Sequence, residues 1–190
     1  MSKLGLIRTP ENLYTKAGLV AGTVDTDLSE QGIIDTQILC SRLKKTMWHK
    51  LYTSDMKRCV HASDIVQENC SVIDHEMVES LYAREYGDFT GLSKEQIYNQ
   101  YGNTVSEHML NSFNDSPPGG ETLANIISRT QCFYDKKLLP RLNDGKNVLC
   151  ILHHDVMFVL LAHINIVNIE DYKQNYFPHN KFIEFNYDKD

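Results

Sequence analysis

Short apolar runs alternate with longer amphipathic segments along this chain. Consecutive apolar residues predict buried strands at 3–7, 51–53, 72–73 and 147–152, and a more polar run at 181–187 predicts a strand at the sheet edge. Because the strands alternate with predicted helices, the pattern indicates an α/β fold. We expect a three-layer sandwich, with a mostly parallel central sheet and helices on both of its faces.

Four helices are predicted between these strands. Ser29 and the pair Ser54-Asp55 are candidate caps for the first two, and Asp155 for the last. Residues 119–121 open a third, long helix, which Pro140 should end or kink because proline lacks the backbone N–H. The apolar positions of the first helix recur at helical spacing and are Ile34, Ile38, Leu39 and Leu43.

Composition narrows the class of protein. A chain of 190 residues without linkers or repeats suits one domain spanning 1–190. The net charge of −6 comes from scattered charges of both signs, which argues against a nucleic-acid partner. No apolar run is long enough for a membrane span, and no signal peptide is evident. Five widely spaced cysteines fit reduced thiols in a cytoplasmic protein, and we expect no metal or other cofactor.

Chemically versatile side chains follow the predicted strands. Arg8 ends the first strand, Arg58 begins the helix after 51–53, and His153 and His154 follow 147–152. Carboxyl ends of parallel strands are where ligands bind in such sheets. A guanidinium group can donate two parallel hydrogen bonds to two oxygens of one phosphate. This set of residues therefore predicts a site for a phosphorylated or otherwise anionic small molecule.

Six sequence blocks extend this interpretation along nearly the whole chain. They are Leu-Ile-Arg at 6–8, Gly-Thr-Val-Asp-Thr-Asp-Leu-Ser-Glu-Gln-Gly at 22–32, Tyr-Thr-Ser-Asp-Met-Lys-Arg at 52–58, Tyr-Gly-Asp-Phe-Thr-Gly at 86–91, Pro-Pro-Gly-Gly-Glu-Thr at 117–122 and Val-Leu-Cys-Ile-Leu-His at 148–153. In this order the blocks resemble the signatures of the histidine phosphatase superfamily, whose best-known branch is the phosphoglycerate mutases.

The resemblance implies a phosphoryl-transfer site with two substituted positions. In the family, a histidine after the first strand carries the phosphoryl group, while two arginines and a second histidine hold its oxygens. Arg8, Arg58 and His153 match those phosphate-binding positions. Thr9 stands in the place of the nucleophilic histidine, and Ala83 in the place of the carboxylic acid that protonates the leaving group. General acid catalysis alone is worth about 10²–10⁴ in rate, so both changes together should nearly silence the family mechanism.

Other side chains offer replacements. Glu85 is the candidate acid, because it would share the direction of Ala83 if the segment between them were extended. Thr9 or His153 is the candidate nucleophile, with the threonine hydroxyl needing a base beside it. The remaining candidate pocket residues are Thr15, Thr23, His61, Tyr86 and His154.

Three functions are therefore open from the sequence. The first is a protein that retains a phosphate pocket without phosphohistidine catalysis, either a pseudophosphatase or an enzyme redirected to another reaction on an anionic metabolite. The second is an active phosphatase or phosphomutase that uses Thr9 or His153 as nucleophile and Glu85 as acid. The third is a structural protein with a vestigial pocket and a protein partner.

Overall fold

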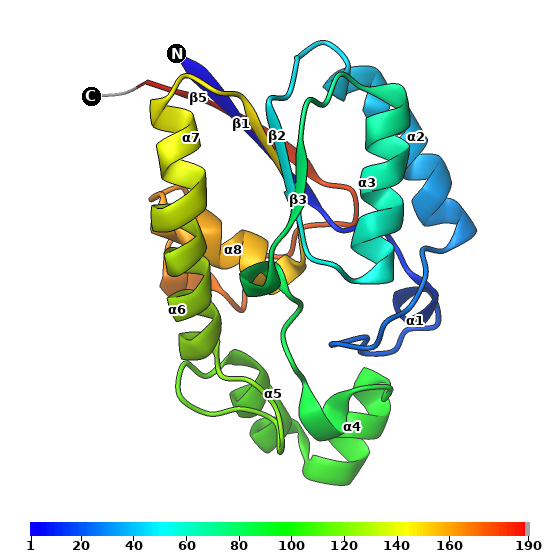
Figure 1. Cartoon of the computed structure of the whole chain (residues 1–190). Coiled ribbons are helices and arrows are strands. Elements are labelled where there is room, and N and C mark those ends of the chain that lie inside the picture. The colour runs from blue at the N-terminus through cyan, green and yellow to red at the C-terminus, as the bar shows by residue number, and fades with distance from the viewer. Residues whose placement is uncertain (189–190) are drawn as a thin grey trace.

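The computed structural model describes residues 1–188, which contain a five-stranded sheet in the order β3-β2-β4-β1-β5. β1, β2, β3 and β4 run parallel to their neighbours, and β5 pairs antiparallel with β1 at the edge, as predicted (Figure 1). The strands are β1 (Ser2–Arg8), β2 (Lys50–Thr53), β3 (His75–Met77), β4 (Val148–Leu152) and β5 (Phe182–Tyr187).

Helices cover both faces of this sheet, which confirms the three-layer α/β sandwich (Figure 1). Successive residues of β4 divide between two apolar cores: Leu149 and Ile151 pack with α2 and α3, while Cys150 and Leu152 pack with α6 and α8. The helices are α1 (Leu13–Lys16), α2 (Glu30–Leu43), α3 (Lys57–Asn69), α4 (Lys94–Tyr101), α5 (Asn103–Asn111), α6 (Leu123–Phe133), α7 (Leu139–Asn143) and α8 (His154–His163).

The third predicted strand lies a few residues later than expected. Residues 72–73 were predicted to form it, but Val72 makes only an isolated bridge, and β3 occupies His75–Met77. The buried ammonium of Lys50 explains the difference, because it lies 2.7 Å from carboxylates on both Asp74 and Glu76. An ion-paired polar segment, rather than the apolar run, therefore pairs with β2.

The first helix is rotated relative to its predicted face. Ser29 caps α2 as predicted, but Ile34 and Ile38 are 43% and 64% exposed. Leu39 and Leu43 are buried as predicted, and the rest of the buried face carries Gly32, Thr36 and Cys40. A Cβ on Gly32 would lie only 2.2 Å from the carbonyl oxygen of Glu11, so the glycine lets the helix pack directly against the loop that follows β1.

Two predicted helix caps have other roles. Met56 occupies the N-cap of α3 without a capping hydrogen bond from its side chain, so Ser54 and Asp55 lie before the cap. His153 occupies the N-cap of α8, which places Asp155 inside the first turn. The Ser54 hydroxyl contacts His153 instead, and the carboxylate of Asp155 accepts a hydrogen bond from Tyr86.

The long helix begins and ends differently from its prediction. Thr122 caps α6, and its hydroxyl accepts a hydrogen bond from the backbone N–H of Asn125 at 3.1 Å. Pro140 does not end the helical path: a π-helical turn at Tyr134–Leu138 leads into α7, which holds the proline in its first turn. A proline is tolerated there because first-turn N–H groups need no helical acceptor.

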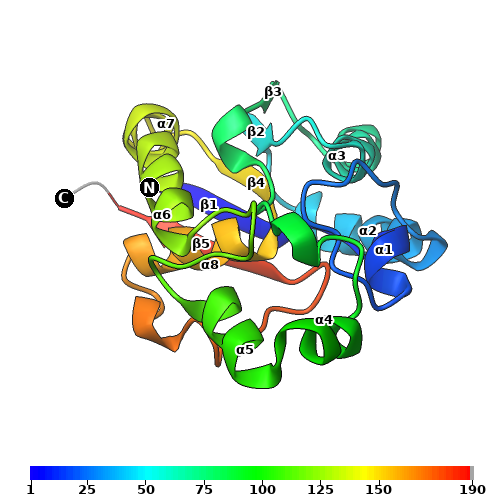
Figure 2. The ribbon, with the colours of Figure 1, turned by 90° about the horizontal axis from the view of Figure 1, so that it is seen from below.

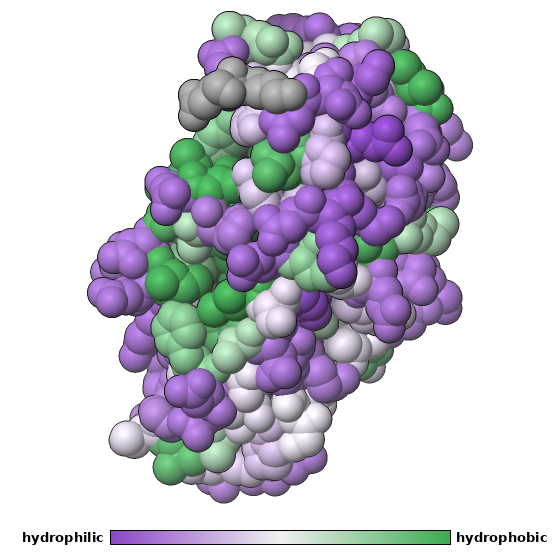
Figure 3. All heavy atoms as spheres, turned by 60° about the vertical axis from the view of Figure 1, so that its left-hand side comes forward, coloured by the Kyte–Doolittle hydropathy of each residue, from purple (hydrophilic) through white to green (hydrophobic). Residues whose placement is uncertain are grey.

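Helices α4 and α5 lie beyond the carboxyl ends of the parallel strands, so they come forward when the molecule is seen from that end (Figure 2). The space-filling view from the α6 side shows a largely hydrophilic surface interrupted by several apolar patches (Figure 3). None of the helices within residues 1–188 has the length and apolar character that crossing a membrane requires.

Candidate active site

A cavity of about 270 Å³ lies where β1 and β4 end, as the sequence predicts. We call it the strand-end cavity. A backbone hydrogen bond of 2.8 Å from the N–H of Thr9 to the carbonyl of Leu152 ties the two strand ends together beside it. Its lining includes Arg8, Thr9, Arg58, Ala83, Arg84 and His153.

Thr9 and His153 meet in the wall of this cavity. The Thr9 hydroxyl lies 3.5 Å from Nδ1 of His153 and 3.6 Å from the sulfur of Cys59. The other ring nitrogen, Nε2, lies 3.1 Å from the hydroxyl of Ser54 and 3.4 Å from the Cys59 sulfur. Both nitrogens of His153 thus have neighbours within the protein, and neither is free in this arrangement.

Burial and nearby cations keep His153 neutral. Desolvation lowers the pKa of His153 well below its usual value, and the charges of Arg58, Arg129 and Arg8 lower it further. Burial also raises the pKa of the Cys59 thiol, which therefore stays protonated near neutral pH. The wall formed by these groups contributes dipoles and no charge.

The two predicted arginines reach the strand-end cavity while bound to backbone carbonyls. Arg58 is 2% exposed and donates to the carbonyls of Val24 at 2.6 Å and Gly22 at 2.8 Å. Arg8 donates to the carbonyl of Phe177, and its guanidinium lies 4.7 Å from the centre of the Tyr176 ring. Burial lowers the pKa of Arg58, which signals an incompletely compensated positive charge.

Arg84 is a third buried arginine, and the sequence analysis missed it. Its guanidinium is fully enclosed and donates to the carbonyls of Glu121 at 3.0 Å, Leu110 at 2.7 Å and Met109 at 3.2 Å. These bonds attach the end of α5 to the cavity wall. Its position directly after Ala83 was the one signal in the sequence that could have drawn attention to it.

No carboxylate within residues 1–188 forms an ion pair with Arg8, Arg58 or Arg84. The strand-end cavity holds a single carboxylate, that of Asp155. Its oxygens accept hydrogen bonds from the Tyr86 hydroxyl at 3.0 Å and from the Tyr172 hydroxyl. Three guanidiniums against one carboxylate make the cavity positively charged and suited to an anion.

Two further histidines line the strand-end cavity. Nδ1 of His154 is buried without a hydrogen-bond partner among the described residues, and burial lowers the pKa of its ring. His179, which the sequence gave no reason to select, places its Nδ1 3.0 Å from the carbonyl of Thr9. Burial and the charge of Arg8 lower the pKa of His179 as well.

Four other predicted site residues occupy different surroundings. Thr15 lines the strand-end cavity, but its hydroxyl is engaged in a capping box with Asn12 at the start of α1. His61 does not line this cavity, and neither do Glu85 and Thr23.

Glu85, the candidate acid, does not line the strand-end cavity, whereas Ala83 does. The Glu85 carboxylate instead accepts hydrogen bonds from the Thr23 hydroxyl and, at 3.0 Å, from the N–H of Gly87. That N–H begins the 3₁₀ turn Gly87–Phe89, where a free donor attracts a carboxylate. Glu85 therefore holds two loops together and is removed from the cavity.

Comparison with known proteins shows to which family this chain belongs. The profile of the histidine phosphatase superfamily (branch 1) matches residues 4–190. This chain belongs to the histidine phosphatase superfamily. It is 30% identical over 172 residues to a 2,3-bisphosphoglycerate-dependent phosphoglycerate mutase from Cytophaga hutchinsonii, covering 90% of this chain and 81% of that protein.

Solved structures of two phosphatases share its fold. The α-ribazole phosphatase from Shigella flexneri superposes with a TM-score of 0.84 at 20% identity, covering 98% of this chain and 91% of that one. A mycobacterial glucosyl-3-phosphoglycerate phosphatase complexed with VO₃ gives a TM-score of 0.85 at 17% identity, with coverages of 97% and 90%. At these identities the likeness concerns the α/β architecture alone.

Proposed function

We propose that this superfamily member binds a phosphorylated or anionic small molecule in the strand-end cavity without carrying out phosphohistidine catalysis. One observation carries the proposal: the cavity is strongly cationic, yet the residue that follows β1 in its wall is Thr9. The relative named above is a 2,3-bisphosphoglycerate-dependent phosphoglycerate mutase, and the structural neighbours are a glucosyl-3-phosphoglycerate phosphatase and an α-ribazole phosphatase, which supports a phosphorylated ligand.

The groups around Thr9 and Ala83 support the absence of the family chemistry. A threonine hydroxyl cannot form a phosphohistidine, and the methyl group of Ala83 cannot protonate a leaving oxygen. Glu85, the candidate replacement acid, is held by Thr23 outside the cavity. Both carboxylate oxygens of Asp155 are already engaged, by the hydroxyls of Tyr86 and Tyr172.

A second function rests on the contact between Thr9 and His153. The Thr9 hydroxyl lies 3.5 Å from Nδ1 of a neutral imidazole, which is an arrangement that permits a histidine to accept the hydroxyl proton. An active phosphatase would then form a phosphothreonine. His153 itself is less suited as the nucleophile, since Thr9, Ser54 and Cys59 already contact its two nitrogens.

Thermal unfolding with and without inorganic phosphate tests the binding. A ligand at 100 times its dissociation constant stabilises the folded state by about 2.7 kcal/mol. Phosphate should raise the melting temperature of the wild type and of Arg42→Met, whose arginine lies on the exposed side of α2. Arg58→Met should remove the phosphate-dependent shift. A cavity that gives no shift with phosphate or vanadate would favour a vestigial pocket.

Incubation with p-nitrophenyl phosphate and 3-phosphoglycerate separates the two functions. We expect no turnover above the level seen with Thr9→Ala and no phosphoryl adduct in mass spectra of the intact protein. Turnover that Thr9→Ala abolishes, with an adduct mapped to Thr9, would instead establish threonine-based phosphoryl transfer.

A further inference from the structure

A second cavity adjoins the strand-end cavity at Ala83, whose side chain lines both. We call it the acidic cavity, and its volume is about 710 Å³. It is lined by Thr23, Asp55, Glu79, Ser80, Tyr82, Ala83, Glu121 and Arg129. Thr23, which was expected in the phosphate pocket, thus lies on the other side of Ala83.

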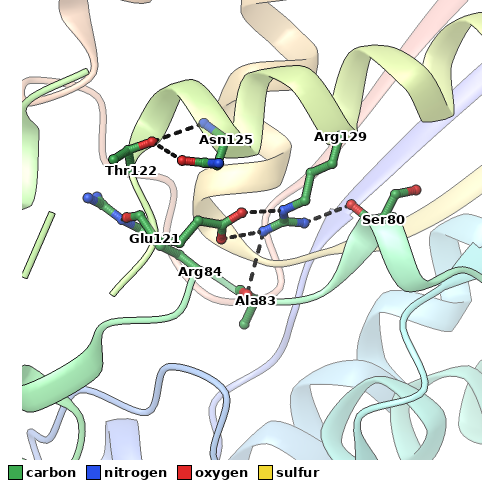
Figure 4. Close-up of polar contacts among 7 residues, drawn as sticks. All are labelled: Ser80, Ala83, Arg84, Glu121, Thr122, Asn125 and Arg129. Carbon is green, nitrogen blue, oxygen red and sulfur yellow. Dashed lines mark hydrogen bonds and ion pairs between the residues drawn. The ribbon is translucent and has the colours of Figure 1, made fainter. Parts of the chain in front are cut away.

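Among residues 1–188, Arg129 is the one cation that lines the acidic cavity, and its charge is already neutralised. Arg129 on α6 makes two parallel bonds to the Glu121 carboxylate, at 2.8 and 3.0 Å (Figure 4). Two further N–H groups donate to the carbonyls of Ser80 at 2.7 Å and Ala83 at 3.5 Å. Four of its five N–H groups are engaged in these bonds, so this guanidinium fixes the wall of the cavity at Ala83 and its charge is offset by the Glu121 carboxylate.

Two carboxylates of the acidic cavity have no such partner. Asp55 precedes α3 and Glu79 begins the turn before Tyr82, and neither forms an ion pair with any residue in the described range 1–188. Burial and the charge of Asp55 raise the pKa of the Tyr82 hydroxyl, as expected beside negative charge. The acidic cavity is thus net negative, with Ala83 between it and the cationic strand-end cavity.

We infer that the two cavities together take a phosphate monoester that carries a protonated amine. The phosphate would face Arg8 and Arg58, and the ammonium group would pass Ala83 to face Asp55 and Glu79. A simple phosphate dianion would fill only the strand-end cavity. A ligand with a second phosphate group would be repelled by the carboxylates of the acidic cavity. This inference rests on the proposed function, because the strand-end cavity must bind phosphate for the amine to be positioned.

A matched ligand series tests the inference. The probes are ω-aminoalkyl phosphates of increasing chain length, each compared with the ω-hydroxyalkyl phosphate of the same length and with inorganic phosphate. At the length that spans Ala83, the amine should bind about two- to tenfold more tightly than the alcohol, since partly exposed ion pairs are weak. Raising the salt concentration should reduce this preference.

The double variant Asp55→Asn/Glu79→Gln should equalise the amine and alcohol while leaving the affinity for inorganic phosphate unchanged. Glu95→Gln, which removes an exposed carboxylate from α4, is the control and should keep the preference. If the wild type binds inorganic phosphate but shows equal affinity for the amine and the alcohol, the inference is wrong while the proposed function stands. The same conclusion follows if the double variant keeps the preference for the amine. Failure of every phosphate compound, inorganic phosphate included, would overturn the proposed function too.

Discussion

Acid should destabilise this protein through His153. The imidazole is enclosed in the wall of the strand-end cavity, where burial, followed by the charges of Arg58, Arg129 and Arg8, lowers its pKa well below the usual 6.5. In the unfolded chain the same residue titrates near its usual value. Between those two pKa values the unfolded state binds a proton that the folded state does not.

The sign and size of the effect follow from that difference. The stability contributed by neutral His153 is fully present above a pH of about 6.5 and falls as the pH drops below it. Each pH unit within the window costs about 1.4 kcal/mol of unfolding free energy. The loss from His153 therefore accumulates as the pH falls below about 6.5 and continues down to its folded pKa.

Urea unfolding of the wild type and His153→Asn between pH 5 and 7 measures this loss. The variant should lose stability more slowly on acidification, by about 1.4 kcal/mol per pH unit. Lys44→Gln, which removes an exposed cation at the end of α2, should leave the wild-type slope intact. Equal slopes for the wild type and His153→Asn would refute the assignment of the acid sensitivity to this imidazole.

Repeating the urea unfolding at each pH in the presence of phosphate provides a second test of this assignment. A dianion bound beside His153 would offset the field of the arginines and favour the protonated ring. The acid-dependent loss should therefore become smaller when phosphate is present at saturation. If phosphate binds but leaves the slope unchanged, the anion lies away from His153.

Three other variants test the site and its supports. The double variant Thr9→His/Ala83→Glu should hydrolyse p-nitrophenyl phosphate at least about 10²-fold faster than the wild type. If the variant binds phosphate but shows no such gain, these two positions do not account for the missing activity. Gly32→Ala should lower the free energy of unfolding in urea by about 1–3 kcal/mol, because the new Cβ would meet the Glu11 carbonyl, although alanine normally stabilises a helix. The control Gln37→Ala, at an exposed position of α2, should not lower it. A Gly32→Ala variant that is more stable than the wild type would contradict the contact. Glu121→Gln should cost about 1–3 kcal/mol by weakening the paired bonds to Arg129, and unchanged stability would show that those bonds contribute little.

Local patterns in the chain predicted the order of strands and helices and the residues at the strand ends. Arg8 and His153 come directly after apolar runs, so any parallel pairing of those runs brings both side chains to the same edge. The predicted edge position of residues 181–187 also agrees with β5, because a strand paired on one side tolerates polar residues.

Directions of side chains outside the regular elements could not be predicted in this way. Glu85 was assigned the direction of Ala83 from their spacing, whereas its carboxylate binds the hydroxyl of Thr23 and the N–H of Gly87, which begins a 3₁₀ turn. The burial of Arg84 depends on three carbonyls, of Met109, Leu110 and Glu121, that are distant from it in the sequence.

The amino-acid sequence alone thus determined the α/β class, the family resemblance and the presence of Thr9 after the first strand. Tertiary structure decided which polar groups face one another. It buried small residues of α2, gathered around one cavity three arginines that form no ion pair within residues 1–188, and placed an acidic cavity beside it at Ala83. The physical reason is that periodicity records which face of an element is apolar, whereas the charge of a cavity depends on contacts between elements far apart in the chain.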